Sequence, residues 1–136
     1  MSETCEKEEI LIIDTDVLIW YLRGNTHSQK VITENTPFKV SVITYMELIQ
    51  GVQNKRELEI LQKQFKKWSE EIVQINETIS TYAMFLVENY GLSHNMELAD
   101  AMIAATALET NEILLTANDK HYKFIPNIQF KKFRHT

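Results

Sequence analysis

The chain has 136 residues, of which 44% are hydrophobic, 24% charged and 10% aromatic. This composition is typical of one folded domain, predicted here to span residues 1–136, and it excludes intrinsic disorder. The 19 acidic and 14 basic residues give a net charge of −5, which argues against broad electrostatic adhesion to nucleic acid.

A lone cysteine and short apolar runs narrow the class of protein further. Because Cys5 is the only cysteine in the sequence, an internal disulfide framework and a cysteine-based zinc site are excluded. Residues 1–9 are predicted to form a polar tail, and the apolar run 10–13 that follows is too short for a secretory leader. No run approaches the roughly 20 apolar residues of a membrane span. We therefore expect a cytoplasmic protein with no membrane partner.

Predicted strands and helices alternate along the chain. The continuous apolar run 10–13 is typical of a strand buried on both faces of a parallel sheet. Thr44 and Glu47 have the spacing of a capping box, which predicts a helix opening at Thr44. This alternation predicts a three-layer α/β/α sandwich around a central, mostly parallel sheet of four to five strands. The predicted helices are 17–22, 28–34, 44–52, 57–70, 77–90 and 97–109, and the further strands are 38–43, 72–75, 113–115 and, at an edge, 128–130.

Acidic residues fall near the carboxyl ends of these strands. Asp14 and Asp16 follow the first strand, Asp119 lies beyond the fourth, and Glu47 opens the helix after the second. In open parallel α/β sheets, ligand sites gather at that edge. Asp100 lies in an Ala-rich helix, where a buried carboxylate costs several kcal/mol unless a cation meets it.

Each of these acids also has a purely structural interpretation. Asp14 or Asp16 could cap the following helix, Glu47 could complete the capping box, residues 118–119 could form a turn, and Asp100 could face solvent. Taken together, crowded carboxylates repel one another, and the segments that carry Asp14, Asp16, Glu47 and Asp100 contain no Lys or Arg to neutralise them. A divalent cation removes that conflict. Oxygen ligands without convergent Cys or His favour Mg²⁺ or Mn²⁺ over Zn²⁺, which points to phosphodiester or phosphoryl chemistry.

Four segments, taken in order, resemble the successive motifs of PIN-domain ribonucleases. Within that superfamily they are most similar to the toxins of VapBC-type toxin–antitoxin pairs. The segments are IIDTDVLI around Asp14, VITYMELIQG around Glu47, LADAMIAATAL around Asp100 and LLTANDKHY around Asn118. The resemblance runs from about residue 10 to residue 130, nearly the whole chain.

This resemblance implies metal-dependent hydrolysis of RNA phosphodiester bonds, with Mg²⁺ or Mn²⁺ as the cofactor. Asp14, Glu47 and Asp100 match the acidic metal-binding positions of the family. The family's fourth position holds Asp or Asn, and here it is Asn118 with Asp119 beside it. We therefore assign both Asn118 and Asp119 to the predicted catalytic set, with Asp119 as the fourth candidate metal ligand.

The resemblance also implies supporting residues and partners. Asp16 matches a position that binds a metal-held water, and Thr44 and Thr116 match hydroxyls that orient carboxylates or the attacking water. His121 is expected to be structural or solvent-facing. The implied partners are an RNA substrate, a second copy in a homodimer, and a cognate antitoxin whose peptide lies in a hydrophobic groove, for which residues 20–22 are candidates.

Two other functions fit parts of the sequence. A degenerate PIN module that binds RNA or a protein without cleavage is supported by Asn118 and opposed by the retained acids. Asp14-x-Asp16 after a buried strand also opens haloacid-dehalogenase-like phosphatases, in which the first Asp is a nucleophile. That family expects a hydroxyl where this chain has Leu18, and a Lys-bearing stretch that is absent before residue 113.

Overall fold

A five-stranded sheet forms the centre of the protein in the computed structural model, which describes residues 9–136. All pairings between neighbouring strands are parallel, in the order β3-β2-β1-β4-β5. The predicted parallel sheet is therefore confirmed, with β5 at one edge. Residues 1–8 of the predicted polar tail, with Cys5, lie outside the described residues. The strands are β1 (Leu11–Ile13), β2 (Phe38–Ser41), β3 (Ser69–Val73), β4 (Ile113–Thr116) and β5 (Phe130–Lys132).

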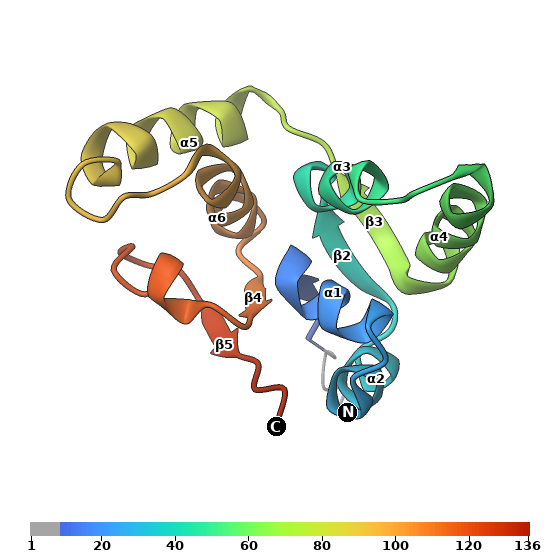
Figure 1. Ribbon diagram of the computed structural model, residues 1–136. Coiled ribbons are helices and arrows are strands. Elements are labelled where there is room, and N and C mark those ends of the chain that lie inside the picture. The colour runs from blue at the N-terminus through green and yellow to red at the C-terminus, as the bar shows by residue number, and fades with distance from the viewer. Residues whose placement is uncertain (1–8) are drawn as a thin grey trace, which may run out of the picture.

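Helices cover both faces of this sheet (Figure 1). Helices α5 and α6 build the core on one face, and α1, α2 and α4 build the core on the other. The predicted three-layer α/β/α sandwich is thus confirmed. The helices are α1 (Thr15–Leu22), α2 (Thr26–Glu34), α3 (Val42–Gln50), α4 (Lys55–Trp68), α5 (Glu77–Tyr90) and α6 (Leu98–Thr110), and a 3-10 turn, η1 (Asp119–His121), follows β4.

Strand β1 contributes to both cores, as its continuous apolar run predicts. Ile12 belongs to the core under α5 and α6, and Leu11 and Ile13 belong to the core under α1, α2 and α4. All three side chains are at most 3% exposed. Burial on both faces explains why this strand has no alternation of apolar and polar residues.

The start of α3 differs from the prediction. The helix begins at Val42, because Ser41 at the end of β2 is its N-cap and the Ser41 hydroxyl accepts a hydrogen bond from the Ile43 N–H at 3.0 Å. Thr44 therefore lies inside the helix and its side chain is buried. The capping-box interpretation of Thr44 and Glu47 was wrong, since Ser41 already supplies the cap.

Strand β3 begins three residues earlier than the predicted 72–75. Helix α4 ends at Trp68, whose buried ring contacts Phe65 edge-on, and Ser69 pairs at once with Phe38 of β2. β3 is an edge strand, and Glu71 within it is exposed. A strand with one solvated side does not need a continuous apolar run, so hydrophobicity alone misplaces its start.

The strand order creates a switch point beside the central strand. From β1 the chain proceeds through β2 to β3 on one side, while β4 and β5 lie on the other. In open α/β sheets the crevice outside the carboxyl ends of the strands at such a point is the usual ligand site. The residues that follow β1 and β4 are therefore the first place to look for function.

Candidate active site

Asp14 occupies the switch point directly after β1. Its backbone N–H donates to the Leu115 carbonyl of β4 at 2.9 Å, so the two strand ends are fixed against each other. The carboxylate is 5% exposed and accepts hydrogen bonds from the Thr15 N–H at 2.8 Å, the Thr116 hydroxyl at 2.9 Å and the Tyr122 hydroxyl at 3.0 Å. Asp14 is both the cap of α1 and the centre of a polar network.

Asp16, in the first turn of α1, lies beside the segment that follows β4. Its carboxylate accepts from the Ala117 N–H at 3.2 Å and from the Asn118 side-chain amide at 3.0 Å. The Asn118 backbone N–H donates to the Thr116 hydroxyl at 3.0 Å, which fixes the turn. The structure thus brings Asn118 to Asp16 through its amide nitrogen.

Asp100 reaches the same network from the first turn of α6. One carboxylate oxygen lies 3.2 Å from the Tyr122 hydroxyl, whose single proton is shared between Asp100 and Asp14, and the other lies 3.0 Å from Nδ1 of His121. The Asp100 side chain is 20% exposed. Tyr122 therefore links the carboxylate at the end of β1 to the carboxylate at the start of α6.

Glu47 stands at the edge of this group, on α3. Its carboxylate accepts from the Thr15 hydroxyl at 2.6 Å, and that hydroxyl also lies 3.0 Å from the buried hydroxyl of Thr44. Thr15 follows Asp14 directly, so α1 and α3 are joined beside the network around Asp14. Asp119 has a different contact, because its carboxylate lies 3.5 Å from the Lys132 ammonium of β5.

Burial disfavours the charged forms of three of these acids. Burial, followed by the charge of Asp16, raises the pKa of Asp14 to about 7. Burial also raises the pKa of Asp16 and of Asp100, and the neighbouring His121 opposes the rise at Asp100. Burial and the charge of Asp14 raise the pKa of the Tyr122 phenol, so the hydroxyl keeps its proton and acts as a donor.

The chemistry of these side chains fits a hard divalent cation. Asp14, Asp16, Asp100 and Glu47 supply carboxylate oxygens, and none of them forms an ion pair with a Lys or Arg within residues 9–136. Their spacing is not that of a formed metal centre. Over the same residues, no three His, Cys, Asp or Glu side chains are grouped as they would be around an ion. The carboxylates are instead hydrogen-bonded to protein donors.

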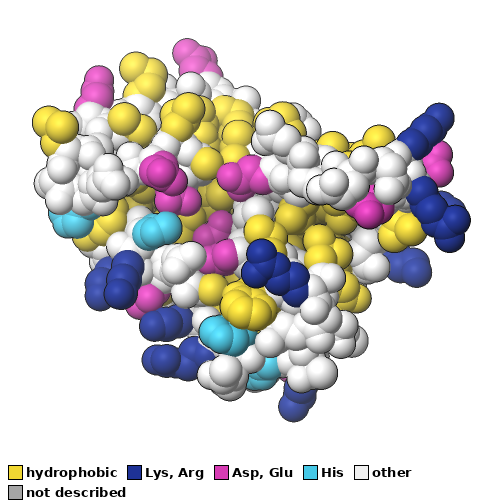
Figure 2. Space-filling view, in the orientation of Figure 1, with side chains coloured by type: hydrophobic (Ala, Val, Ile, Leu, Met, Phe, Trp, Pro, Cys, Tyr) yellow, Lys and Arg dark blue, Asp and Glu magenta, His cyan; other side chains and the backbone are white. Residues whose placement is uncertain are grey.

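Of these acids, Asp14 is buried, Asp16 and Asp100 are partly exposed and Glu47 is exposed. Figure 2 shows acidic side chains near the middle of one face with apolar side chains beside them, a basic side chain close by, and further Lys and Arg side chains toward the edges. A groove of about 490 Å³ between α1, α3 and α4 includes Glu47 and is lined largely by apolar side chains, among them Leu22, Leu48 and Ile60. Its position makes Glu47 the link between the acids and the groove.

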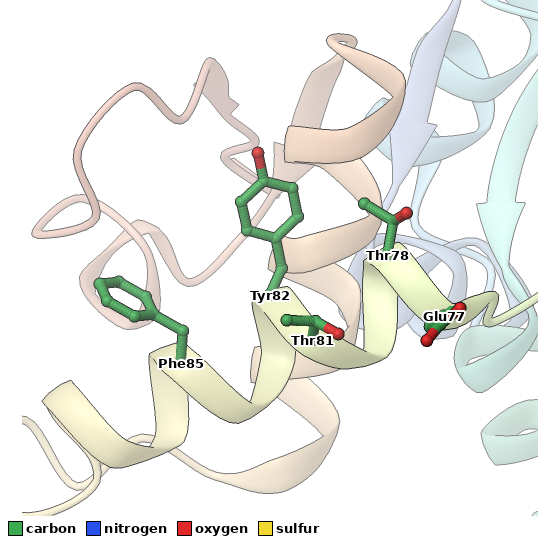
Figure 3. A pocket seen from close by; sticks show the side chains of 5 residues that line it. All are labelled: Glu77, Thr78, Thr81, Tyr82 and Phe85. Atoms are coloured by element: carbon green, nitrogen blue, oxygen red, sulfur yellow. The ribbon is translucent and has the colours of Figure 1, made fainter.

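A second hollow, of about 540 Å³, lies away from the acids. It is formed by α5 alone, and Tyr82 and Phe85 line it together with Glu77 (Figure 3). Tyr82 is 41% and Phe85 53% exposed. This hollow contains none of the predicted site residues and marks an exposed apolar face of α5.

Sequence analysis missed two side chains of this network. Thr15 was given no role because the interpretation of this segment relied on the two acids on either side of it, Asp14 and Asp16. Tyr122 was quoted within the LLTANDKHY segment but given no role, because nothing in its local sequence indicates a contact with distant acids. His121, expected to be structural or solvent-facing, is half-exposed, and its Nδ1 lies 3.0 Å from the Asp100 carboxylate.

Comparison with known proteins gives consistent matches over most of the chain. The family model for the PIN domain matches residues 11–126. Ribonuclease VapC10 from Mycobacterium tuberculosis is 29% identical over 126 residues, covering 88% of this chain and 91% of the relative. Every helix within residues 9–136 is too short or too polar to traverse a lipid bilayer.

Solved structures have the same fold. A toxin–antitoxin complex from Klebsiella pneumoniae contains a chain with a TM-score of 0.73 and 25% identity, covering 88% of this chain and 95% of that one. VapBC-1 from nontypeable Haemophilus influenzae has a TM-score of 0.75 and 25% identity, with coverage of 90% and 97%.

Proposed function

The chain belongs to the PIN-domain family, and from this premise we propose that it is a metal-dependent endoribonuclease that acts in the cytoplasm as the toxin of a toxin–antitoxin pair. One observation carries the proposal: Asp14, Asp16 and Asp100 lie in one hydrogen-bonded network where β1 and β4 end, with raised pKa values and no Lys or Arg ion pair among the described residues. The relatives that are named ribonucleases support the reaction class.

Mg²⁺ or Mn²⁺ is the proposed cofactor, held by Asp14, Asp100 and Glu47. A bound divalent ion lowers the pKa of a coordinated water and stabilises negative charge on a phosphoryl group. The chain's own residues orient the carboxylates: Thr116 donates to Asp14, and Thr15 donates to Glu47.

The fourth position of the site remains a prediction. The Asn118 amide that donates to Asp16 supports a role for Asn118 in orienting Asp16, while the contact of Asp119 with Lys132 draws that carboxylate toward β5. Asp119 is the proposed fourth ligand, and a measurement of metal binding by Asp119→Asn tests this assignment.

A cognate antitoxin is the proposed partner, because the Klebsiella pneumoniae chain with the same fold belongs to a toxin–antitoxin complex. We place an apolar segment of it in the groove between α1, α3 and α4, where the exposed side chains of Leu22 and Ile60 would be covered. A peptide there would contact Glu47 and so hinder access to the acids. Co-purification with the product of the adjacent reading frame tests this, and Ile60→Glu should abolish it.

A homodimer is also proposed, and the exposed apolar face of α5 is where it can be tested. Tyr82 and Phe85 present their rings to solvent on one helix (Figure 3). Light scattering of the wild type should give a dimer and that of Phe85→Glu a monomer. A wild-type monomer at micromolar concentration would contradict the proposal.

Cleavage of a labelled RNA tests the activity directly. The wild type should cleave with Mn²⁺ and be inactive in EDTA, and Asp100→Asn should lose at least about 100-fold of the rate while remaining folded. Glu88→Gln, on the exposed surface of α5, removes the same charge and should retain full activity. Equal turnover by the wild type and Asp100→Asn would remove the mechanism, and RNA binding without cleavage by the wild type would favour the degenerate PIN module.

A further inference from the structure

The single polar side-chain atom of Tyr122 contacts carboxylates from two distant segments of the chain. Tyr122 is fully buried, and its ring belongs to the core under α5 and α6. The hydroxyl lies 3.0 Å from Oδ2 of Asp14 and 3.2 Å from Oδ1 of Asp100. Because the ring is held by the core, the hydroxyl is presented to both acids from a fixed position.

The hydroxyl is not needed to fill the core. A phenylalanine ring would occupy the same volume without bringing a polar atom out of water, and burying a hydroxyl is unfavourable unless it is hydrogen-bonded. The hydrogen bonds of this hydroxyl are with Asp14 and Asp100. Its role is therefore to be sought at these two carboxylates.

The hydrogen bonds of Asp14 show how far that carboxylate is already oriented. Oδ2 receives both the Thr116 and the Tyr122 hydroxyls, and Oδ1 receives the Thr15 N–H. Each carboxylate oxygen has about two acceptor sites, so the remaining one belongs to Oδ1. The Thr116 hydroxyl and the Thr15 N–H each donate to Asp14, whereas the Tyr122 hydroxyl also reaches Asp100.

We propose that Tyr122 is a positioning residue of the cation site, whose hydroxyl ties Asp14 to Asp100 and thereby raises the affinity of the pair for Mg²⁺ or Mn²⁺. The inference rests on the proposed metal-dependent function. Asp14 follows a strand and Asp100 opens a helix on the other side of the network, and the backbone does not join these two elements locally. The phenol supplies that connection through one atom, so it limits the independent motion of two proposed ligands.

Manganese titration calorimetry on metal-free protein tests the proposal without any turnover. Tyr122→Phe removes only the hydroxyl, and we expect it to bind Mn²⁺ about 10- to 100-fold more weakly than the wild type. Tyr90→Phe is the matched control, because it also removes a phenol hydroxyl, from a ring that packs against Phe124 and His94. The affinity of Tyr90→Phe for Mn²⁺ should equal that of the wild type. A folded Tyr122→Phe that binds Mn²⁺ as tightly as the wild type, or more tightly, overturns the proposal.

Kinetics separate a positioning role from a general loss of structure. In Tyr122→Phe the cleavage rate at low Mn²⁺ should fall, raising the Mn²⁺ concentration should restore it, and the KM for RNA should remain within about twofold of the wild type. A loss of kcat that excess Mn²⁺ does not restore would contradict the assignment.

A measurement on unaltered protein covers the case in which Tyr122→Phe fails to fold. Tyrosine labelled with ¹³C at Cζ and introduced at position 122 should change its chemical shift on Mg²⁺ addition, while the same label at position 90 should not. An unchanged signal at position 122 in protein that binds Mg²⁺ overturns the role of Tyr122 and leaves the proposed nuclease intact. Absence of any Mg²⁺ or Mn²⁺ binding by the wild type refutes the proposed function itself.

Discussion

Replacing Asp14 by asparagine should stabilise the metal-free protein above neutral pH. Burial and the charge of Asp16 raise the pKa of Asp14 from 3.8 to about 7. The folded state therefore binds more protons than the unfolded state between about pH 4 and pH 7, and wild-type stability falls as the pH rises through that window. Above it, the ionised Asp14 destabilises the fold by about 4 kcal/mol, at about 1.4 kcal/mol for each tenfold change in the ionisation constant.

Asparagine can keep part of the hydrogen bonding of Asp14. Its carbonyl oxygen can still accept from the Thr15 N–H, while its amide nitrogen faces the Thr116 and Tyr122 hydroxyls, which can rotate to accept. Allowing for this rearrangement, we expect Asp14→Asn to be more stable than the wild type by about 2 kcal/mol or more at pH 8, and by close to zero at pH 4.

Urea unfolding in EDTA across this pH range measures the difference. Glu88→Gln, which removes an exposed charge, is the control and should follow the wild type at every pH. Saturating Mn²⁺ should stabilise the wild type at pH 8 and have a smaller effect on Asp14→Asn, because a neutral amide oxygen binds the ion more weakly than a carboxylate. A stability difference that is absent at pH 8, or that does not change with pH, would refute this account of the acidic network.

Two further substitutions test individual contacts. Asn118→Asp replaces the amide that donates to Asp16 at 3.0 Å with a second carboxylate. The free energy of unfolding of the metal-free protein should fall by about 1–3 kcal/mol at pH 8, and the variant should bind Mn²⁺ more tightly. Unfolding in EDTA and calorimetry measure these two effects, and unchanged stability would contradict the contact. Gly24 has a φ of 86°, and a Cβ added there would have no other residue's atom within 4 Å, so only backbone strain opposes Gly24→Ala. The urea midpoint should report a loss of about 1 kcal/mol in the free energy of unfolding. A gain in stability would show that the turn can adopt another conformation.

Local patterns in the sequence were sufficient to predict the parallel sheet and most of the helices. Residues 10–13 include no polar residue because β1 is covered on both faces of the sheet. The continuous apolar run therefore predicts this burial directly. Helix α5 has the predicted bounds because its signals are local: the Asn76 side chain caps its first turn, and Gly91 follows its end.

Where two residues could fulfil the same local role, the sequence alone did not decide between them. Ser41 and Thr44 are both good helix caps, and only the length of β2 places Ser41 at the first turn of α3. In the same way, Asn118 and Asp119 are equally plausible as polar neighbours of the acids. The pairing of β1 with β4 brings the Asn118 amide to Asp16, while the course of β5 brings Lys132 to Asp119.

The sequence by itself determined that Asp14 and Asp16 follow a buried central strand and that Asp100 opens a helix of small residues. Only the tertiary structure decided which donors meet these carboxylates. Tyr122 becomes their common partner because the turn after β4 carries its ring into the core and its hydroxyl to the strand end. Periodicity encodes which face of an element is buried, whereas the pairing of polar atoms depends on where chain ends from different elements converge.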